Sequence, residues 1–237
     1  MIMLLLSHPA SFPVCGEAPH SQQRGELQTM KFDISRFPLI PNRHRMRIAM
    51  ASLGEWIRGL DFTLPDRLYD RNRNDGAMYY ASPASVLQQI FSQIDISRFP
   101  RFIDIGCGKG YVLWQAKKYG FSQVGGVEYD DKLCQICRKN MKRLKLDIDP
   151  VCADAREFQN YGDYDVFYFF NPFVDEVMRQ VIDQILRQCR GREIMLVYYR
   201  PRYTDYIETC GYFTRVAKLF DPVNKYDIHI YQGKLPS

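Results

Sequence analysis

Short apolar runs alternate along this chain with longer segments whose apolar residues have helical spacing. The clearest case begins at Phe102–Ile105, an apolar run broken only by one acid, and it ends in three glycines at every second position within Asp104–Gly110. Residues 110–119 then place their apolar side chains on one helix face. This stretch predicts a strand, a tight turn and a helix, the first unit of a doubly wound α/β sheet. The glycines let the backbone turn sharply and approach a ligand closely.

The same alternation continues on both sides of this unit. Tyr164–Phe170 is apolar on both faces apart from Asp165, which predicts a central parallel strand. The last two expected strands are joined through residues 221–224, as in a hairpin. The expected strands are 102–105, 123–127, 150–152, 164–170, 194–199, 212–219 and 226–231, and the expected helices are 84–94, 110–119, 131–145, 174–189 and 203–210.

The spacing of the glycines argues against two common nucleotide-binding loops. A Walker loop requires Ser or Thr after its lysine, whereas Lys109 is followed by Gly110. A dinucleotide fingerprint would require glycine at Tyr111 or at Leu113. The remaining pattern is Asp-x-Gly-x-Gly-x-Gly over residues 104–110.

Polar residues follow the ends of three further predicted strands. Glu128 comes 24 residues after Asp104, where a carboxylate can accept hydrogen bonds from both ribose hydroxyls. Asp154 follows the third strand and offers an acceptor to an adenine amino group. The alternative for each acid is a role at the start of the next helix. Asn171-Pro172-Phe173 ends the central strand, where ligands bind in such sheets.

The N-terminal part predicts an extension outside this sheet. Residues 1–29 are expected to be a disordered leader, because their apolar start lacks a positive n-region, and a lipoprotein cleavage site at Cys15 is a weak alternative. Residues 30–80 form a helical and loop extension, with a helix over about 44–59 and a loop over 61–80. This loop either covers a ligand site or only caps the core. Ser82 is the expected N-cap of the next helix, with Pro83 as its first residue.

Charge and cysteine content exclude few kinds of partner or cellular location. The formal net charge of +5 permits an anionic partner without requiring one, and the basic cluster at 43–47 fits a solvated helix face or a nucleic-acid contact. Seven scattered cysteines predict reduced thiols and a cytoplasmic location. Cys134 and Cys137 have no partners at zinc-site spacing, so we expect buried thiols and no metal site. No apolar run reaches the roughly 18 residues of a membrane span.

Four features in order resemble the class I S-adenosylmethionine (SAM)-dependent methyltransferases: Asp104–Gly110, Glu128, Ala153–Asp154 and Asn171–Phe173. The likeness covers about residues 80–232, and the Tyr-Tyr-Ala-Ser-Pro and Phe-Phe-Asn-Pro-Phe segments are most similar to uncharacterised bacterial members. The resemblance implies a doubly wound, Rossmann-like seven-strand sheet, mostly parallel with a C-terminal antiparallel hairpin and helices on both faces. It assigns SAM binding to a domain at residues 81–237.

The resemblance also implies roles for individual residues. The glycine turn would hold the methionine part of SAM, Glu128 the ribose and Asp154 the adenine. Asn171–Phe173 is similar to part of the Asn-Pro-Pro-aromatic signature of amine-methylating enzymes, in which the Asn carbonyl holds the target amino group; the second proline is absent here. The expected cofactor-binding residues are Asp104, Gly106, Cys107, Gly108, Gly110, Glu128, Tyr129, Asp154, Ala155 and Asn171.

We hypothesise that Asn171, Phe173 and Tyr80, with Tyr198, line the side of the methyl acceptor. None is a strong base, because tyrosine titrates near about 10, and all four histidines lie outside the predicted strand ends. A nitrogen or an acidic oxygen is therefore the easier nucleophile. A small molecule or a protein is the favoured acceptor, and a nucleic acid stays open. Alternatives are a non-catalytic SAM-binding regulatory or partner protein, an RNA-modifying enzyme and, disfavoured by the glycine spacing, a nicotinamide-dependent oxidoreductase.

Overall fold

The computed structural model of the chain describes residues 53–55, 57–63 and 82–236. The chain divides into two units, residues 1–31 and 32–237, and all described residues belong to the second. The expected leader, the basic cluster at 43–47, Tyr80 and most of the 61–80 loop lie outside the described residues. Within the described part, no helix is both long and apolar enough to cross a membrane.

A single seven-stranded sheet organises the second unit, in the order β3-β2-β1-β4-β5-β7-β6. The first five strands in sequence pair in parallel, whereas β7 pairs antiparallel with both β5 and β6. The expected fold class is therefore confirmed, including the C-terminal hairpin. The strands are β1 (Arg101–Ile105), β2 (Gln123–Glu128), β3 (Val151–Cys152), β4 (Val166–Phe170), β5 (Glu193–Tyr199), β6 (Phe213–Asp221) and β7 (Tyr226–Lys234).

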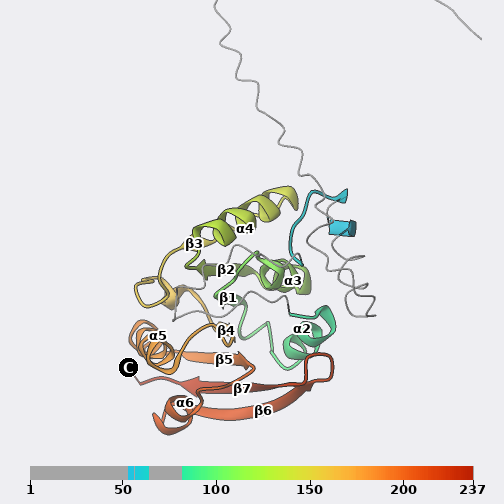
Figure 1. Ribbon diagram of the computed structural model, residues 1–237. Coiled ribbons are helices and arrows are strands. Elements are labelled where there is room, and N and C mark those ends of the chain that lie inside the picture. Colours follow the sequence, from blue (N-terminus) through green and yellow to red (C-terminus); the bar gives the residue numbers. More distant parts are fainter. Residues whose placement is uncertain (1–52, 56, 64–81, 237) are drawn as a thin grey trace, which may run out of the picture. The chain divides into compact units, whose positions relative to one another are not determined.

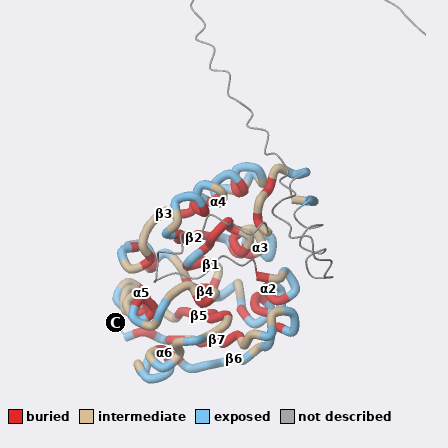
Figure 2. The backbone as a smooth tube through the Cα atoms, in the orientation of Figure 1, coloured by how far each residue is buried: buried red, intermediate tan, exposed pale blue. Residues whose placement is uncertain are grey.

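Helices cover both faces of this sheet (Figure 1). One face packs against α2 (Ala84–Phe91), α3 (Tyr111–Tyr119) and α4 (Asp131–Arg143). The other face packs against α5 (Asp175–Gln188) and α6 (Asp205–Thr209). Buried residues follow the strands and the inner helix faces, and the outer faces of the helices are exposed (Figure 2). This layering brings the carboxyl ends of the parallel strands to one edge of the sheet.

The start of α2 differs from its prediction. Pro83 occupies the N-cap position and makes no side-chain cap. Ser82, expected to be the N-cap, is instead buried, and its Oγ lies 2.8 Å from the hydroxyl oxygen of Tyr168 on β4. The helix also ends at Phe91 instead of 94. The Ser82 hydroxyl therefore contacts Tyr168 and does not cap the helix, as local sequence preferences had predicted it would.

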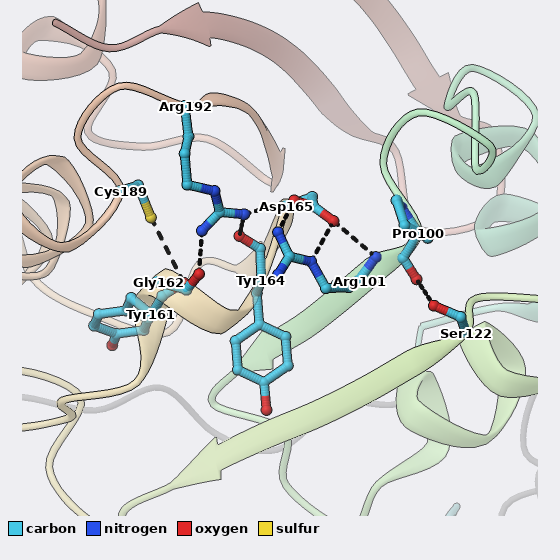
Figure 3. A network of polar contacts seen from close by, with 9 residues as sticks. All are labelled: Pro100, Arg101, Ser122, Tyr161, Gly162, Tyr164, Asp165, Cys189 and Arg192. Atoms are coloured by element: carbon cyan, nitrogen blue, oxygen red, sulfur yellow. Dashed lines mark hydrogen bonds and ion pairs between the residues drawn. The ribbon is translucent and has the colours of Figure 1, made fainter. Parts of the chain in front are cut away.

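A polar cluster closes the opposite, amino-terminal edge of the sheet (Figure 3). Asp165 accepts hydrogen bonds from Arg101 Nε at 2.9 Å and Nη2 at 2.7 Å, and from Arg192 Nη2 at 2.6 Å. Arg192 also donates to the backbone carbonyls of Gly162 and Tyr164. Burial opposes ionisation of Asp165, but the two guanidiniums outweigh it and lower the pKa of this carboxyl. The cluster joins the starts of β1, β4 and β5 at the edge opposite the carboxyl ends of the parallel strands.

Candidate functional site

The glycine turn between β1 and α3 forms the centre of the candidate site. Gly106, Gly108 and Gly110 have φ values of +88°, +53° and +85°, in the left-handed region where glycine carries no steric cost. The N–H groups of Gly106 and Cys107 donate to the carbonyl of Val127 at 2.8 and 3.0 Å. The turn is therefore fixed against the end of β2. The N–H groups of the first turn of α3 lie at the edge formed by the carboxyl ends of the parallel strands.

At two of these glycines, neighbouring atoms leave no room for a side chain. A Cβ on Gly106 would lie 3.0 Å from the Cβ of Pro172, which follows β4. A Cβ on Gly110 would lie under 3.0 Å from the Sγ of Cys137 on α4. The turn is thus packed between the end of β4 and α4, and a side chain at either position would displace one of them. Cys134 and Cys137 are buried, as predicted for structural thiols.

Two buried carboxylates flank the turn. Asp104 is buried at the end of β1 and accepts no hydrogen bond from any described residue. Burial, and then the negative charge of Glu128, raise the pKa of Asp104 well above its ordinary value. Burial also raises the pKa of Glu128, and the backbone N–H groups of Asp130 and Gly108 partly offset this. Since neither acid has an ion-pair partner among the described residues, this position favours a cationic or hydroxyl-rich ligand.

Glu128 also organises the turn itself. Its Oε2 accepts the N–H of Gly108 at 2.7 Å and its Oε1 accepts the N–H of Asp130 at 2.9 Å. Each carboxylate oxygen retains a second lone pair that can accept a ligand hydroxyl. The alternative role as a helix-starting acid falls instead to Asp130, which caps α4 by accepting from the N–H groups of Lys132 and Leu133.

The residues expected around the nucleoside lie beside the ends of β2 and β3. Tyr129 is 54% exposed, and the N–H of Ala153 donates to the carbonyl of Glu128 at 3.0 Å, which places Asp154 next to the end of β2. The Asp154 carboxylate binds the Arg156 guanidinium, and this hydrogen bonding lowers the pKa of Asp154. Ala155 is buried. Asp154 is therefore held ionised by Arg156, and its contact with adenine stays a prediction.

Asn171 directly follows β4 in an unusual conformation. Its φ is +40°, a region that few side chains other than Asn and Asp adopt. The residue is 7% exposed, and its Oδ1 has no hydrogen-bond partner among the described residues. Phe173 is half-buried and packs against the cluster on the α5 face, where Tyr198 is fully buried. Of the residues predicted on the acceptor side, Asn171 and Tyr198 are both buried, and the Asn171 Oδ1 and the Tyr198 hydroxyl have no hydrogen-bond partner among the described residues.

Two polar arrangements escaped prediction from the sequence. Lys109, inside the glycine turn, is buried and pairs with Asp61. His229 was expected to lie away from the strand ends, but β7 places it opposite Tyr198, one residue before the end of β5. Antiparallel register decides this position, and no local pattern encodes it.

A hydrogen-bonded chain fixes the His229 ring. The hydroxyl of Tyr231 donates to Glu208 at 2.9 Å, so His229 Nδ1, 3.0 Å from the same hydroxyl oxygen, is the donor of that pair. The Nε2 atom is buried without a partner among the described residues. Burial, and then the positive charges of Arg215 and Lys218, lower the pKa of His229 below its ordinary value.

Comparison with known proteins agrees with this geometry. Residues 102–191 match the family model of a methyltransferase domain. A ribosomal protein L11 methyltransferase from Thermotoga neapolitana is 27% identical over 115 residues, which is 48% of this chain and 42% of that protein. The chain thus matches less than half the length of these curated relatives.

Solved structures share the fold. A Pyrococcus horikoshii protein described as a candidate RNA methyltransferase superposes with a TM-score of 0.53 at 20% identity, covering 80% of this chain and 96% of that chain. An RNA methyltransferase from Salinibacter ruber, solved with S-adenosyl-L-homocysteine, gives 0.52 at 15% identity, covering 67% and 95%. The matched domain, the glycine turn and the sheet order together make this chain similar to the class I SAM-dependent methyltransferases.

Proposed function

We propose that this chain binds SAM at the glycine turn and transfers its methyl group to an acceptor by in-line displacement. When bound, SAM supplies a methyl group on a sulfonium that needs no further activation. The protein must bind and align the two reactants and exclude water. The matched methyltransferase domain and the two buried carboxylates at the turn support this proposal.

The chain's residues fit such a ligand on physical grounds. Asp104 is a buried carboxylate without a hydrogen bond from the described residues, so it gains from a nearby ammonium or sulfonium charge. Glu128 can accept the ribose hydroxyls with its remaining lone pairs. The left-handed glycines let the backbone turn sharply and approach a ligand closely. Together with Cys107, Tyr129, Asp154 and Ala155, these residues make up the proposed cofactor site.

The acceptor side of the proposal rests on one observation, the unpartnered and buried Oδ1 of Asn171. An amide oxygen held there accepts a hydrogen bond, so it selects an acceptor that presents an N–H or O–H group. Such a bond would turn the nucleophile's lone pair toward the cofactor. Phe173 and Tyr80 are proposed to flank the acceptor. The names of the relatives include RNA and ribosomal-protein methyltransferases, and both of these acceptors carry suitable nitrogens.

The test uses the full chain with labelled SAM and fractionated cell extract, and it measures S-adenosylhomocysteine formation. We expect one fraction to support turnover, and Asn171→Ala to lower that turnover by about 100-fold because the acceptor is no longer oriented. Asn160→Ala, at an exposed asparagine, is the matched control and should retain activity. Wild-type turnover that is unchanged in Asn171→Ala would refute the acceptor role. SAM binding without turnover in any fraction would favour the non-catalytic alternative.

A further inference from the structure

A short segment outside the matched domain packs directly onto the glycine turn. We call residues 57–63 together with Glu55 the hook. The Glu55 Oε2 accepts the N–H groups of Phe62 and Thr63, both at 2.9 Å, and also the hydroxyl of Thr63 at 2.9 Å. The N–H of Leu60 donates to the Glu55 carbonyl at 2.8 Å. These bonds give the hook a defined conformation of its own.

The hook is anchored in the core by one aromatic side chain. Phe62 is fully buried and stacks on Trp114, with centroids 5.5 Å apart and planes within 5°. It also meets the edge of Tyr111 at 5.4 Å. Both partners belong to α3, the helix that the glycine turn opens. The hook is therefore placed relative to α3 by well-packed contacts.

One ion pair and one amide join the hook to the turn. Lys109 Nζ lies 2.8 Å from Asp61 Oδ1, and the two side chains are 1% and 13% exposed. Asn140 on α4 accepts the N–H of Asp61 at 3.0 Å. It donates to the carbonyls of Asp61 at 2.8 Å and of Lys109 at 2.9 Å. Lys109 is thereby held at both its ammonium and its carbonyl.

We propose that Asp61 and Asn140 are positioning residues for the cofactor turn. Lys109 lies between Gly108 and Gly110, so holding it preserves their backbone conformation and keeps the Gly108 N–H on Glu128. When the buried Lys109 ammonium loses the Asp61 carboxylate, its side chain is no longer held at this position, and the adjoining backbone can move with it. This inference rests on the proposed function, because it assumes that the turn binds SAM.

The test measures SAM affinity by isothermal titration calorimetry on the full chain. Asp61→Asn keeps the side-chain shape but removes the charge, and it should weaken SAM binding by roughly tenfold or more, since the Lys109 ammonium loses the carboxylate that lies 2.8 Å from it. The matched control is Asp149→Asn, which removes the partner of Arg138 in an exposed ion pair with α4. The control should bind within about twofold of wild type.

A second measurement separates positioning from general stability. Hydrogen exchange at the Gly108 amide should accelerate in Asp61→Asn, whereas the Gly106 amide, bonded to Val127, should not change. The double variant Asp61→Asn/Lys109→Gln removes both charges of this buried pair together, so we expect it to recover most of the affinity. If Asp61→Asn does not fold, Lys109→Gln alone should still speed exchange at Gly108.

Wild-type affinity and wild-type Gly108 exchange in a folded Asp61→Asn or Lys109→Gln would overturn the inference. If wild-type protein itself does not bind SAM, the proposed function fails instead. The exchange data then still decide whether the hook positions the turn.

Discussion

Replacing Gly110 by Ala tests the packing of the cofactor turn most sharply. Gly110 combines a φ of +85° with a neighbouring Sγ, that of Cys137, which an added Cβ would approach to under 3.0 Å. The left-handed conformation costs a side chain about 1–2 kcal/mol. Forcing the thiol and the adjoining α4 away should add about 1–3 kcal/mol, as for other overpacked cores. We therefore expect Gly110→Ala to lower the free energy of unfolding by about 2–5 kcal/mol.

The chain provides a control that separates the two contributions. Gly211 has a similar φ of +81°, but a Cβ built there meets nothing within 4 Å. Gly211→Ala should therefore show only the backbone cost of about 1–2 kcal/mol. Equilibrium urea denaturation of both variants gives the comparison, provided that the m-values agree. Equal losses in the two variants, within about 0.5 kcal/mol, would contradict the packing described around the turn.

A double variant identifies the neighbour responsible. If the clash with the Cys137 thiol dominates, Cys137→Ala should be less harmful in the Gly110→Ala background than in the wild type. A favourable coupling of about 1 kcal/mol or more is expected for residues in such direct contact. Strict additivity would show that the cost comes from elsewhere. SAM affinity should fall with Gly110→Ala as well, since Gly110 is the N-cap of α3.

Three further predictions concern ionisable groups. Because the pKa of Asp104 is raised above its ordinary value, SAM affinity should increase as the pH rises through this raised pKa and the carboxyl ionises. Calorimetry of Asp104→Asn should show a flatter pH profile. The pKa of Asp165 is lowered, so the stability that this carboxylate contributes is present above about pH 4 and is lost as the pH falls through the folded-state pKa. Arg192→Met should therefore lower the free energy of unfolding by about 1–3 kcal/mol at pH 7, measured by urea denaturation, and the stability of the variant should depend less on acid. A denaturation curve identical to that of the wild type would count against the network. His229 has a lowered pKa, so protonation of this side chain in the unfolded chain should destabilise the fold below about pH 6.5. In thermal melts, His229→Gln should make the melting temperature depend less on pH in this range. An NMR titration that gives His229 an unshifted pKa would contradict this prediction.

The main architecture could be predicted because its signals are local. The switch from an apolar run to helical spacing around Asp104–Gly110 located β1, the turn and α3. Tyr164–Phe170 was recognised as central because it is apolar on both faces, and β4 does lie between β1 and β5. The resemblance to methyltransferases then supplied the expected roles of the residues at the strand ends, and these roles stay predictions.

The missed features all depend on contacts between distant residues. Asp61 and Lys109 are 48 residues apart, and Asp61 and Asn140 are 79 apart, so no motif joins them. Ser82 met the requirements of an N-cap, but Tyr168 lay close enough to take its hydroxyl. His229 came to lie opposite Tyr198 through the antiparallel register of β7. Tertiary packing decided each case, and it overrides local preference.

The central claim is that the glycine turn and its buried acids bind a cationic sulfur nucleoside. Titration of the full chain with SAM in a calorimeter tests it most directly, with Asp104→Asn alongside. We expect saturable one-site binding by the wild type and a clear loss of affinity in the variant, because we propose that the buried Asp104 carboxylate lies near the positive charge of the ligand. Absence of binding heat and of any thermal shift with wild-type protein, or equal affinity in the two proteins, would contradict it.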